Sequence, residues 1–426
     1  MTNNSMAKIS NVIARQILDS RGNPTVESTV LLDSGVFATS SCPGGASMGA
    51  HEAIELRDHD QNDYDGKSVH KAVDNINGAI KTTLVGKDAT DIREIDKLLL
   101  MLDNTANKSN LGANAILSVS MASTKAIAFS MGLPVYQYLY QILQSKQPLS
   151  IPKPLCNLIN GGMHAGKNLD IQEFIVSPLL APTFAEGLKE VVHVATTLRT
   201  MLVAKGFQPL VGDEGGFAPK LTTNEEALEL LREAITNAGY QNHDHIALGM
   251  DAAASTFYKD GSYTLRDKSE PLSAAELGIY YVMLAQKYNL FYLEDPFAED
   301  TFEDWAAFLP TTPPNLIVTG DDLLVTNPDR LAIALEKKAV RGIIIKPNQI
   351  GTVSEAIEVV KKAKAAGLKV VASHRSGETT DDFIADFAVG VGADFAKFGA
   401  PVRGERVVKY NRLLQIEQEL AISDKR

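Results

Sequence analysis

The first forty residues alternate apolar and polar side chains, as half-buried β-strands do. We expect three strands here, at residues 12–18, 25–32 and 36–41. The segments Arg21–Pro24 and Asp33–Gly35 separate them and carry the glycine, asparagine and proline of hairpin turns. From residue 69 the period becomes helical, and we expect helices at residues 69–83, 92–102, 114–128 and 135–143. An antiparallel sheet followed by helices predicts a small α+β domain.

The rest of the chain alternates short apolar runs with amphipathic helices. The strand candidates are residues 155–159, 171–176, 246–250, 290–293, 316–319, 342–345, 370–372 and 394–396. Segment 352–366 illustrates the helices, because its apolar residues recur at helical spacing while Glu358 and Lys362 lie on the opposite face. Strands that alternate with helices in this way predict a (β/α)8 barrel. An open, doubly wound sheet is the alternative, since the number of strands does not establish closure.

A proline-punctuated stretch, residues 145–154, separates the two patterns. We therefore expect an N-terminal α+β domain at residues 1–147, with a three-stranded antiparallel sheet plus helices. A C-terminal catalytic α/β barrel should occupy residues 148–426.

Composition excludes several classes of protein. The chain has 426 residues, 45% of them hydrophobic, and a net charge of −11, so it is neither disordered nor attracted to nucleic acid or anionic membranes. The two cysteines, Cys42 and Cys156, are too few for a disulfide framework. Residues 1–16 lack the pattern of an export signal, and no apolar run is long enough to span a bilayer. We expect a cytoplasmic protein without a membrane span.

Polar residues follow the later apolar runs of the barrel domain. They are Asp251, Glu294, Asp321, Lys346, His374 and Lys397. The carboxyl ends of barrel strands share one edge, where active sites are built. We therefore expect these side chains to converge.

The three carboxylates of this set need a compensating cation. Oxygen ligands without histidine or cysteine at metal spacing favour Mg²⁺; the alternative is that each acid merely caps or solvates a strand end. An unperturbed lysine, with a pKa of about 10.4, is a poor base at neutral pH. A neighbouring lysine and a divalent ion would lower the pKa of Lys346 or Lys397 toward a useful range. Alternatively, both lysines simply pair with the acids.

Three glycine-rich segments carry further candidates. Gly212–Gly216 contains Glu214, 160–166 contains His164, and Arg375 with Ser376 combines a planar donor with a hydroxyl, a good phosphate site. Taken singly, such residues are more often ordinary loop residues. The sequence has no Walker motif and no GxGxxG that opens a helix.

The chain also resembles the enolase family, the phosphopyruvate hydratases, along nearly its whole length. The stretches that carry the resemblance are DSRGNPTVE, GASMGAHEAIELRD, LGANAILSVS, NLINGGMHAG, IQEF, VGDEGGFAP, LEDPF, GDDLLVTNP, IIIKPNQIGT, SHRSGET and VKYNRLL. The resemblance implies a TIM barrel with irregular first units and one antiparallel strand, preceded by a smaller N-terminal domain.

The resemblance assigns roles to individual residues. It implies Lys346 as the base and Glu214 as the general acid, assisted by Glu173, with Lys397 and His374 in the catalytic set. Burial and Glu173 should raise the pKa of Glu214. The implied substrate contacts are His164, Gln172, Arg375, Ser376 and Lys397. The implied ligands are Asp251, Glu294 and Asp321 for one Mg²⁺ and the loop residue Ser47 for a second, which binds with substrate.

The implied activity is the Mg²⁺-dependent, reversible dehydration of 2-phosphoglycerate to phosphoenolpyruvate in glycolysis and gluconeogenesis, through a metal-stabilised enediolate. A homodimer or octamer in the cytoplasm is implied, with a secondary cell-surface or secreted pool that no segment of this chain indicates. Gly44, Met48 and Met163 depart from the family pattern and bear on loop closure.

Two alternatives remain. One is a relative that racemises or cycloisomerises carboxylic acids. This alternative is disfavoured by the presence of Ser47, Glu214, Arg375 and Ser376. The other is a non-catalytic protein on the same scaffold, which should have lost charged residues that are all present here.

Overall fold

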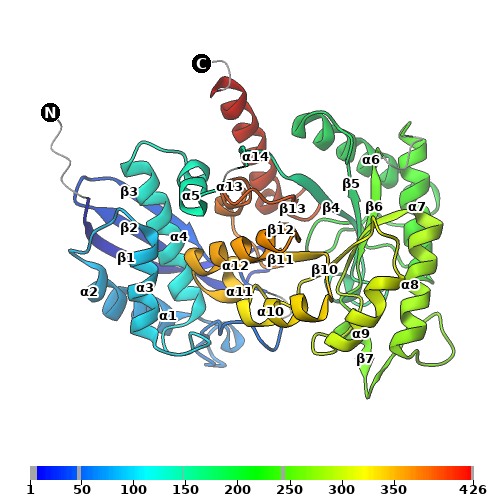
Figure 1. Ribbon diagram of the computed structural model, residues 1–426, viewed down its shortest axis with the longest axis horizontal. Coiled ribbons are helices and arrows are strands. Elements are labelled where there is room, and N and C mark those ends of the chain that lie inside the picture. Colours follow the sequence, from blue (N-terminus) through cyan, green and yellow to red (C-terminus); the bar gives the residue numbers. More distant parts are fainter. Residues whose placement is uncertain (1–6, 46–48, 146, 241–244, 424–426) are drawn as a thin grey trace. The chain divides into compact units, whose positions relative to one another are not determined.

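A computed structural model describes residues 7–45, 49–145, 147–240 and 245–423 (Figure 1). Its internal contacts divide the chain into two compact units. The first comprises Met1–Ser150, Lys346–Lys361 and Arg375–Gly392, and the second comprises Ile151–Ile345, Lys362–His374 and Ala393–Arg426.

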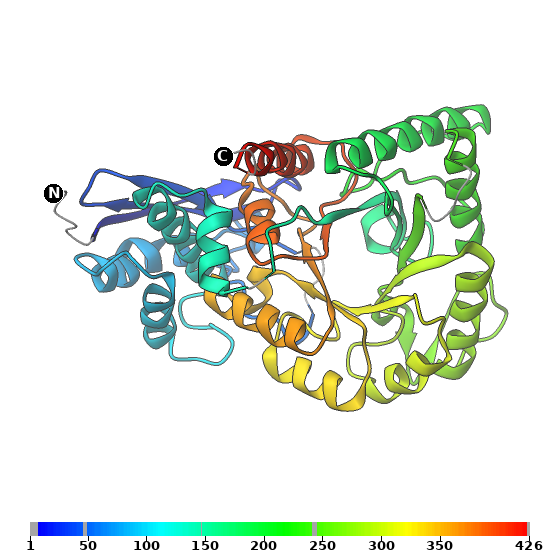
Figure 2. The ribbon, with the colours of Figure 1, turned by 45° about the horizontal axis from the view of Figure 1, so that its top comes forward.

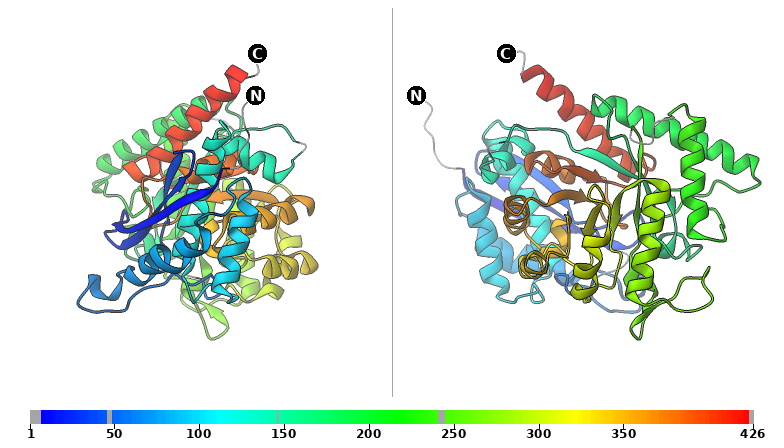
Figure 3. Two further views of the ribbon diagram at one scale, coloured as in Figure 1. Left: turned by 90° about the vertical axis from the view of Figure 1, so that its left-hand side faces the viewer. Right: turned by 45° about the vertical axis from the view of Figure 1, so that its right-hand side comes forward.

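The first unit contains the predicted three-stranded antiparallel sheet, in the order β1 (Ile9–Leu18), β2 (Pro24–Leu32) and β3 (Phe37–Ser41). The turns at Gly22 and Gly35 have φ values of 75° and 86°, which glycine adopts without strain. Helix α4 (Ala113–Ser130) packs against β2 and β3 and is buried over most of its length. Figure 3 shows the cyan helices of this unit beside its blue strands.

The expected helices of this unit are confirmed. Residues 70–84 form a continuous helical segment, close to the expected 69–83, in which the π-helical turn η2 separates α1 from α2. The other elements of the unit are η1 (Tyr64–Gly66), α1 (His70–Asn75), η2 (Ile76–Ile80), α2 (Lys81–Leu84), α3 (Ile92–Asp103), α5 (Val135–Leu143), α11 (Pro347–Ile350) and α13 (Phe383–Gly390).

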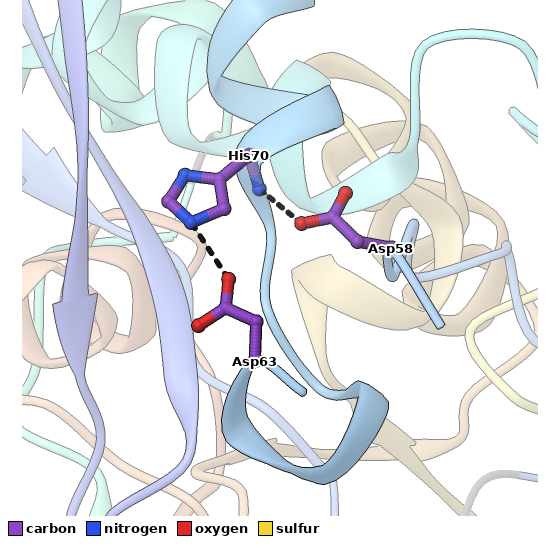
Figure 4. A group of neighbouring side chains, drawn as sticks. All are labelled: Asp58, Asp63 and His70. Carbon is purple, nitrogen blue, oxygen red and sulfur yellow. Dashed lines mark hydrogen bonds and ion pairs between the residues drawn. The ribbon is translucent and has the colours of Figure 1, made fainter. Parts of the chain in front are cut away.

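A surface group of Asp58, Asp63 and His70 marks the start of α1 (Figure 4). The carboxylate of Asp58 accepts hydrogen bonds from the backbone amides of His70 and Lys71, at 2.7 and 2.9 Å. Asp63 Oδ2 lies 2.9 Å from His70 Nε2. Partial burial raises the pKa of Asp58, but these amide bonds outweigh it and the pKa is lowered. We therefore interpret this group as one that satisfies the free backbone amides at the start of α1.

The second unit is a closed barrel, which excludes the open sheet. The strand order is β10-β11-β12-β13-β4-β5-β6-β9. All the strand candidates of this domain are strands: β4 (Lys153–Asn160), β5 (Glu173–Ser177), β6 (Ala247–Asp251), β9 (Leu290–Glu294), β10 (Ile317–Gly320), β11 (Gly342–Ile345), β12 (Lys369–Ser373) and β13 (Phe395–Lys397). As the resemblance implies, β5 is antiparallel to both neighbours, and the loop that joins it to β4 contains a short 3₁₀ turn in place of an α-helix.

Helices alternate with the later barrel strands, and Figure 2 shows α6, α7 and α8 outside them. Threonine or serine side chains cap α6, α7 and α8, and Asn327 caps α10. The helices are α6 (Phe184–Ala204), α7 (Asn224–Asn237), α8 (Ala274–Tyr288), α9 (Phe302–Phe308), α10 (Pro328–Lys337), α12 (Val353–Ala365) and α14 (Gly404–Ser423). The short elements are η3 (Gly162–Ala165), η4 (Ala254–Phe257), β7 (Tyr258–Lys259), β8 (Ser262–Tyr263) and η5 (Leu309–Thr311).

Apolar side chains from the strands fill the barrel. Leu155, Ile175, Tyr292, Ile344 and Val371 are among the buried members of this core. Such packing keeps the strand ends in fixed positions.

No single helix of the described ranges has both the length and the apolar composition needed to cross a bilayer. Helices α4 and α5 meet the criterion only as a pair, with a bend of 101° between them.

The first unit contains a buried ion pair whose removal should be costly. Lys125 Nζ lies 2.9 and 3.0 Å from the Asp381 carboxylate, with side chains only 12% and 10% exposed. Lys125→Met leaves that carboxylate uncompensated, so we expect a loss of roughly 3 kcal/mol in the free energy of unfolding. Urea denaturation measures it. The control Lys361→Met breaks the partly exposed pair with Glu358 and should cost less than about 1 kcal/mol. Equal losses would contradict the argument.

Candidate active site

The barrel brings polar residues together at the carboxyl ends of its strands. Asp251, Glu294 and Lys397 are the last residues of β6, β9 and β13. The register places Asp251 beside Glu294 on one side and beside Glu173, the first residue of the antiparallel β5, on the other. All four side chains are buried. The convergence expected at this edge is therefore present for these residues.

Lys397 lies at the centre of this group. Its Nζ is 3.1 Å from Asp251 Oδ2, 2.8 Å from Glu294 Oε1 and 3.2 Å from Glu173 Oε2. Burial lowers the pKa of Lys397, but the carboxylates of Asp251, Glu173 and Glu294 outweigh it and raise the pKa well above normal. Lys397 is therefore a cation that pairs with the acids, the simpler of the two interpretations of this lysine.

Tyr292 supports the same group and was not predicted. Its hydroxyl donates to Glu294 Oε2 over 2.6 Å from a fully buried position. The two residues lie two positions apart on β9, so their side chains share one face of the strand. The i, i+2 spacing of a tyrosine before the strand-end acid is the sequence signal that could have identified it.

Asp321 belongs to a different acidic group. Within the described residues, the ligand atoms of Asp295, Asp321 and Asp322 lie within 4.8 Å of one another, whereas Asp251, Glu294 and Asp321 do not form such a group. Asp295, another unpredicted residue, accepts from the backbone amides of Asp321 and Asp322 at 2.9 and 2.8 Å. Burial, Asp322 and Asp321 raise its pKa well above normal. It fixes the loop that carries Asp321.

These residues fit a hard divalent cation by their donor chemistry. Asp251, Glu294 and Asp321 offer only carboxylate oxygens, which Mg²⁺ prefers. An ammonium held between Asp251 and Glu294 shows that the two carboxylates accommodate a positive charge. Binding of Mg²⁺ by Asp321 with them stays a prediction.

A second buried group joins His164, Glu173 and Glu214, whose ligand atoms lie within 4.8 Å of one another. His164 Nδ1 is 3.6 Å from Glu173 Oε1 and 3.7 Å from Glu214 Oε1. Burial and Glu214 raise the pKa of Glu173 well above normal. For Glu214, burial raises the pKa, but His164 and His374 outweigh it and the pKa falls well below normal.

The expected rise in the pKa of Glu214 is thus wrong. The two neighbouring acids shift in opposite directions, with the pKa of Glu173 raised and that of Glu214 lowered. The neighbours that reverse the direction, His164 and His374, come from loops remote in sequence.

His374 lies directly after β12, and its backbone amide donates to the Lys397 carbonyl over 3.0 Å. Its Nε2 is 3.4 Å from Glu214 Oε1. Burial outweighs the nearby Glu214 carboxylate, so the pKa of His374 falls to about 3 and its ring is neutral. Asn157 on β4, which was not predicted, donates to the other oxygen, Glu214 Oε2, over 3.2 Å.

The glycines of 212–216 allow the Glu214 loop to approach the His164 loop closely. A Cβ at Gly212 would lie 2.6 Å from the His164 carbonyl oxygen, too close for any side chain. Gln172 directly precedes Glu173 and is buried. Its backbone amide donates to the Asp251 carbonyl over 3.0 Å.

The other predicted residues belong to the first unit. Lys346 directly follows β11 and precedes α11. Arg375 and Ser376 are buried, and the Arg375 guanidinium binds Glu52, which was not predicted, with Nη1 at 2.8 Å from Oε2. Ser47, with Met48, lies outside the described residues. Gly44 bonds the backbone of Gly377.

The neutral state of His374 makes stability depend on pH. In the unfolded chain its pKa is about 6.5, so between that value and about 3 the unfolded state binds more protons and stability falls as pH falls. His374→Gln should flatten the fall by up to about 1.4 kcal/mol per pH unit. Urea denaturation across this range measures both slopes. Identical slopes would contradict a neutral, buried ring.

The ammonium of Lys397 should compete with a divalent cation. Lys397→Met should lower the midpoint of thermal unfolding in chelator and enlarge the rise that Mg²⁺ produces, because the ion then binds carboxylates that have lost their counter-ion. Calorimetry with chelator or Mg²⁺ measures both. The control Lys369→Met removes an exposed lysine at the start of β12, where no change in the Mg²⁺ effect is expected. An unchanged Mg²⁺ effect in Lys397→Met would contradict the competition.

Comparison with known families covers both parts of the chain. Residues 9–139 match the model of the enolase N-terminal domain. Residues 148–425 match that of the enolase C-terminal TIM barrel domain. With both domains in order and a closed barrel with one antiparallel strand, the chain belongs to the enolase family.

Proposed function

We propose that this enolase-family chain is a phosphopyruvate hydratase, a hydro-lyase that dehydrates 2-phospho-D-glycerate reversibly to phosphoenolpyruvate. The observation that carries the proposal is the buried edge of the barrel. There a cationic Lys397 lies among Asp251, Glu173 and Glu294, next to Glu214, and the pKa values of Glu173 and Glu214 are shifted in opposite directions. Such a site suits a reaction that builds negative charge on a carboxylate and then protonates a leaving group.

In the first step, Lys346 removes the proton from C2 of the substrate. One positioned base contributes only about 10²- to 10⁴-fold, so the growing negative charge must be stabilised as well. Lys397 contributes a buried positive charge that needs no reorganisation during the reaction. Mg²⁺ bound by Asp251, Glu294 and Asp321 would supply further positive charge to the substrate carboxylate, and we propose Ser47 for a second ion that binds with substrate.

In the second step, the C3–O bond breaks as the C2=C3 double bond forms. Hydroxide is a poor leaving group, so Glu214 must protonate it, and water departs. Glu173, whose pKa is raised, is the proposed source of that proton, and His164 lies close to both carboxyls. The C2 proton stays on Lys346, so protons and electrons balance.

The remaining predicted residues bind and orient the substrate. Arg375 and Ser376 offer a guanidinium and a hydroxyl to the phosphate. Since the Arg375 guanidinium pairs with Glu52, a phosphate bound there would share or replace that carboxylate. Gln172 and His164 complete the proposed substrate contacts.

We propose further that the boundary of the two domains lies between residues 147 and 148. The chain should act in the cytoplasm as a homodimer or octamer. Light scattering of the purified protein gives the mass that decides between these assemblies.

Two variants should separate the two steps. Lys346→Ala should abolish both exchange of the C2 proton with solvent and formation of phosphoenolpyruvate. Glu214→Gln should retain exchange but lose product by roughly 10²-fold or more, because only the general acid is missing. Deuterium exchange followed by NMR and the ultraviolet absorbance of the enol product measure the steps.

The control is Lys362→Ala, which removes an exposed lysine from α12 and should leave both rates unchanged. If the two site variants behave alike, the division of roles is wrong. If the unaltered protein acts on non-phosphorylated 2-hydroxy acids and not on 2-phosphoglycerate, the proposed reaction is wrong.

A further inference from the structure

A fully buried arginine lies behind His374. Arg406, in the first turn of α14, is 0% exposed. Its Nη1 lies 2.8 Å from His374 Nδ1, and its Nη2 donates to the Asp213 carbonyl over 3.2 Å. Neither contact belongs to the proposed chemistry, and no motif in the sequence pointed to Arg406.

The contact with Nδ1 determines where the proton of His374 lies. A guanidinium carries only donors, so the nitrogen that faces it must be an acceptor. A neutral imidazole has one N–H, which must then be on Nε2. That nitrogen is the one 3.4 Å from Glu214 Oε1. We propose that Arg406 is a positioning residue that fixes His374 in the Nε2–H tautomer and thereby directs its N–H at Glu214.

The lowered pKa of His374 agrees with this arrangement. Burial is the main cause, and the positive charge of Arg406 adds to it, against the opposing effect of Glu214. An imidazolium would place two positive charges side by side away from water. The ring therefore serves as a neutral donor.

The Arg406 guanidinium also binds the backbone next to Glu214. Asp213, whose carbonyl accepts from Nη2, directly precedes Glu214. A planar fork can hold an imidazole and a carbonyl at a fixed separation, which a lysine ammonium on a flexible stem does not. Arg406 thus fixes the position of the His374 ring and of the backbone just before Glu214.

Gly399 provides independent evidence that this packing is specific. A Cβ there would lie 2.6 Å from the Glu214 carbonyl oxygen, 3.0 Å from His374 Cε1 and 3.4 Å from Arg406 Cδ. Its φ of +78° also disfavours any other residue. A residue without a side chain is therefore needed where Glu214, His374 and Arg406 meet.

The functional consequence rests on the proposed role of Glu214 as the general acid. The N–H of His374 faces Glu214 Oε1 at 3.4 Å, and Asn157 donates to Oε2. The oriented group can then receive a proton from Glu173 and pass it to the leaving hydroxide. With the proton of His374 on Nδ1 instead, the ring would present a lone pair to the carboxylate.

The tautomer can be measured in the unaltered protein without reference to activity. Long-range ¹H–¹⁵N NMR spectra of histidine-labelled full-length chain distinguish protonated from unprotonated ring nitrogens. His374→Gln identifies the signals. At neutral pH we expect an unprotonated Nδ1 and a protonated Nε2 for His374. Protonation at Nδ1, or at both nitrogens, would overturn the proposal.

Variants test whether Arg406 is the cause. Arg406→Met removes every donor and should convert His374 to a mixture of tautomers or to Nδ1–H. Arg406→Gln retains an amide donor and should preserve Nε2–H. The matched control, Lys409→Met, removes another buried cation of α14, which bonds the Glu405 carbonyl rather than His374, and should leave the tautomer unchanged. An unchanged tautomer in a folded Arg406→Met would overturn the proposal.

Kinetics then connect the tautomer to the reaction. Arg406→Met should lower dehydration at least about tenfold relative to C2 exchange, and Arg406→Gln should recover part of it. Equal loss of both rates would overturn the link to Glu214. If the unaltered protein shows the Nε2–H tautomer but does not convert 2-phosphoglycerate, the proposed function fails while the positioning by Arg406 stands.

Discussion

The acidic edge of this barrel depends on one buried ammonium, that of Lys397, which compensates the carboxylates around it. The strand register forces Glu173, Asp251 and Glu294 to be neighbours, and buried carboxylates without a counter-ion are expensive. Lys397, from a strand remote in the sequence, compensates them while Tyr292 satisfies a further oxygen of Glu294. The single ammonium of Lys397 neutralises only one of the two carboxylates of Asp251 and Glu294, so a net negative charge remains. The proposed binding of a divalent cation would compensate this remaining negative charge.

Much of this architecture could be predicted from the sequence, because strand ends are local features. The apolar runs and the residue after each one follow from period and turn chemistry alone, which placed Asp251, Glu294 and Lys397 at one edge. Closure and the antiparallel strand could not follow from period alone, since both concern pairing between remote segments. The resemblance supplied the antiparallel strand, and strand pairing in the structure established closure.

The residues that sequence reasoning missed share a different property. Asn157 and Arg406 act on a predicted side chain from another strand or helix, so no local pattern marks them, whereas Tyr292 lies two residues before Glu294 on the same strand. The same reason explains the wrong direction for the pKa of Glu214. Burial and a neighbouring acid could be anticipated, but the sum also depends on His164 and His374, whose distances only the fold sets. The sequence likewise left open whether Lys397 pairs with the acids, because the distances between these remote residues are set only by the fold.

In the proposed reaction, the charges around Glu214 also limit which group can deliver a proton to the leaving hydroxide. His374 cannot, because its pKa of about 3 leaves the ring neutral and Arg406 occupies its second nitrogen. Lys397 is held as a cation by the carboxylates around it. Glu173 is the other buried acid close to Glu214, and burial and the Glu214 charge raise its pKa well above normal. If Glu214 is the acid, Glu173 is therefore the neighbour best suited to supply its proton.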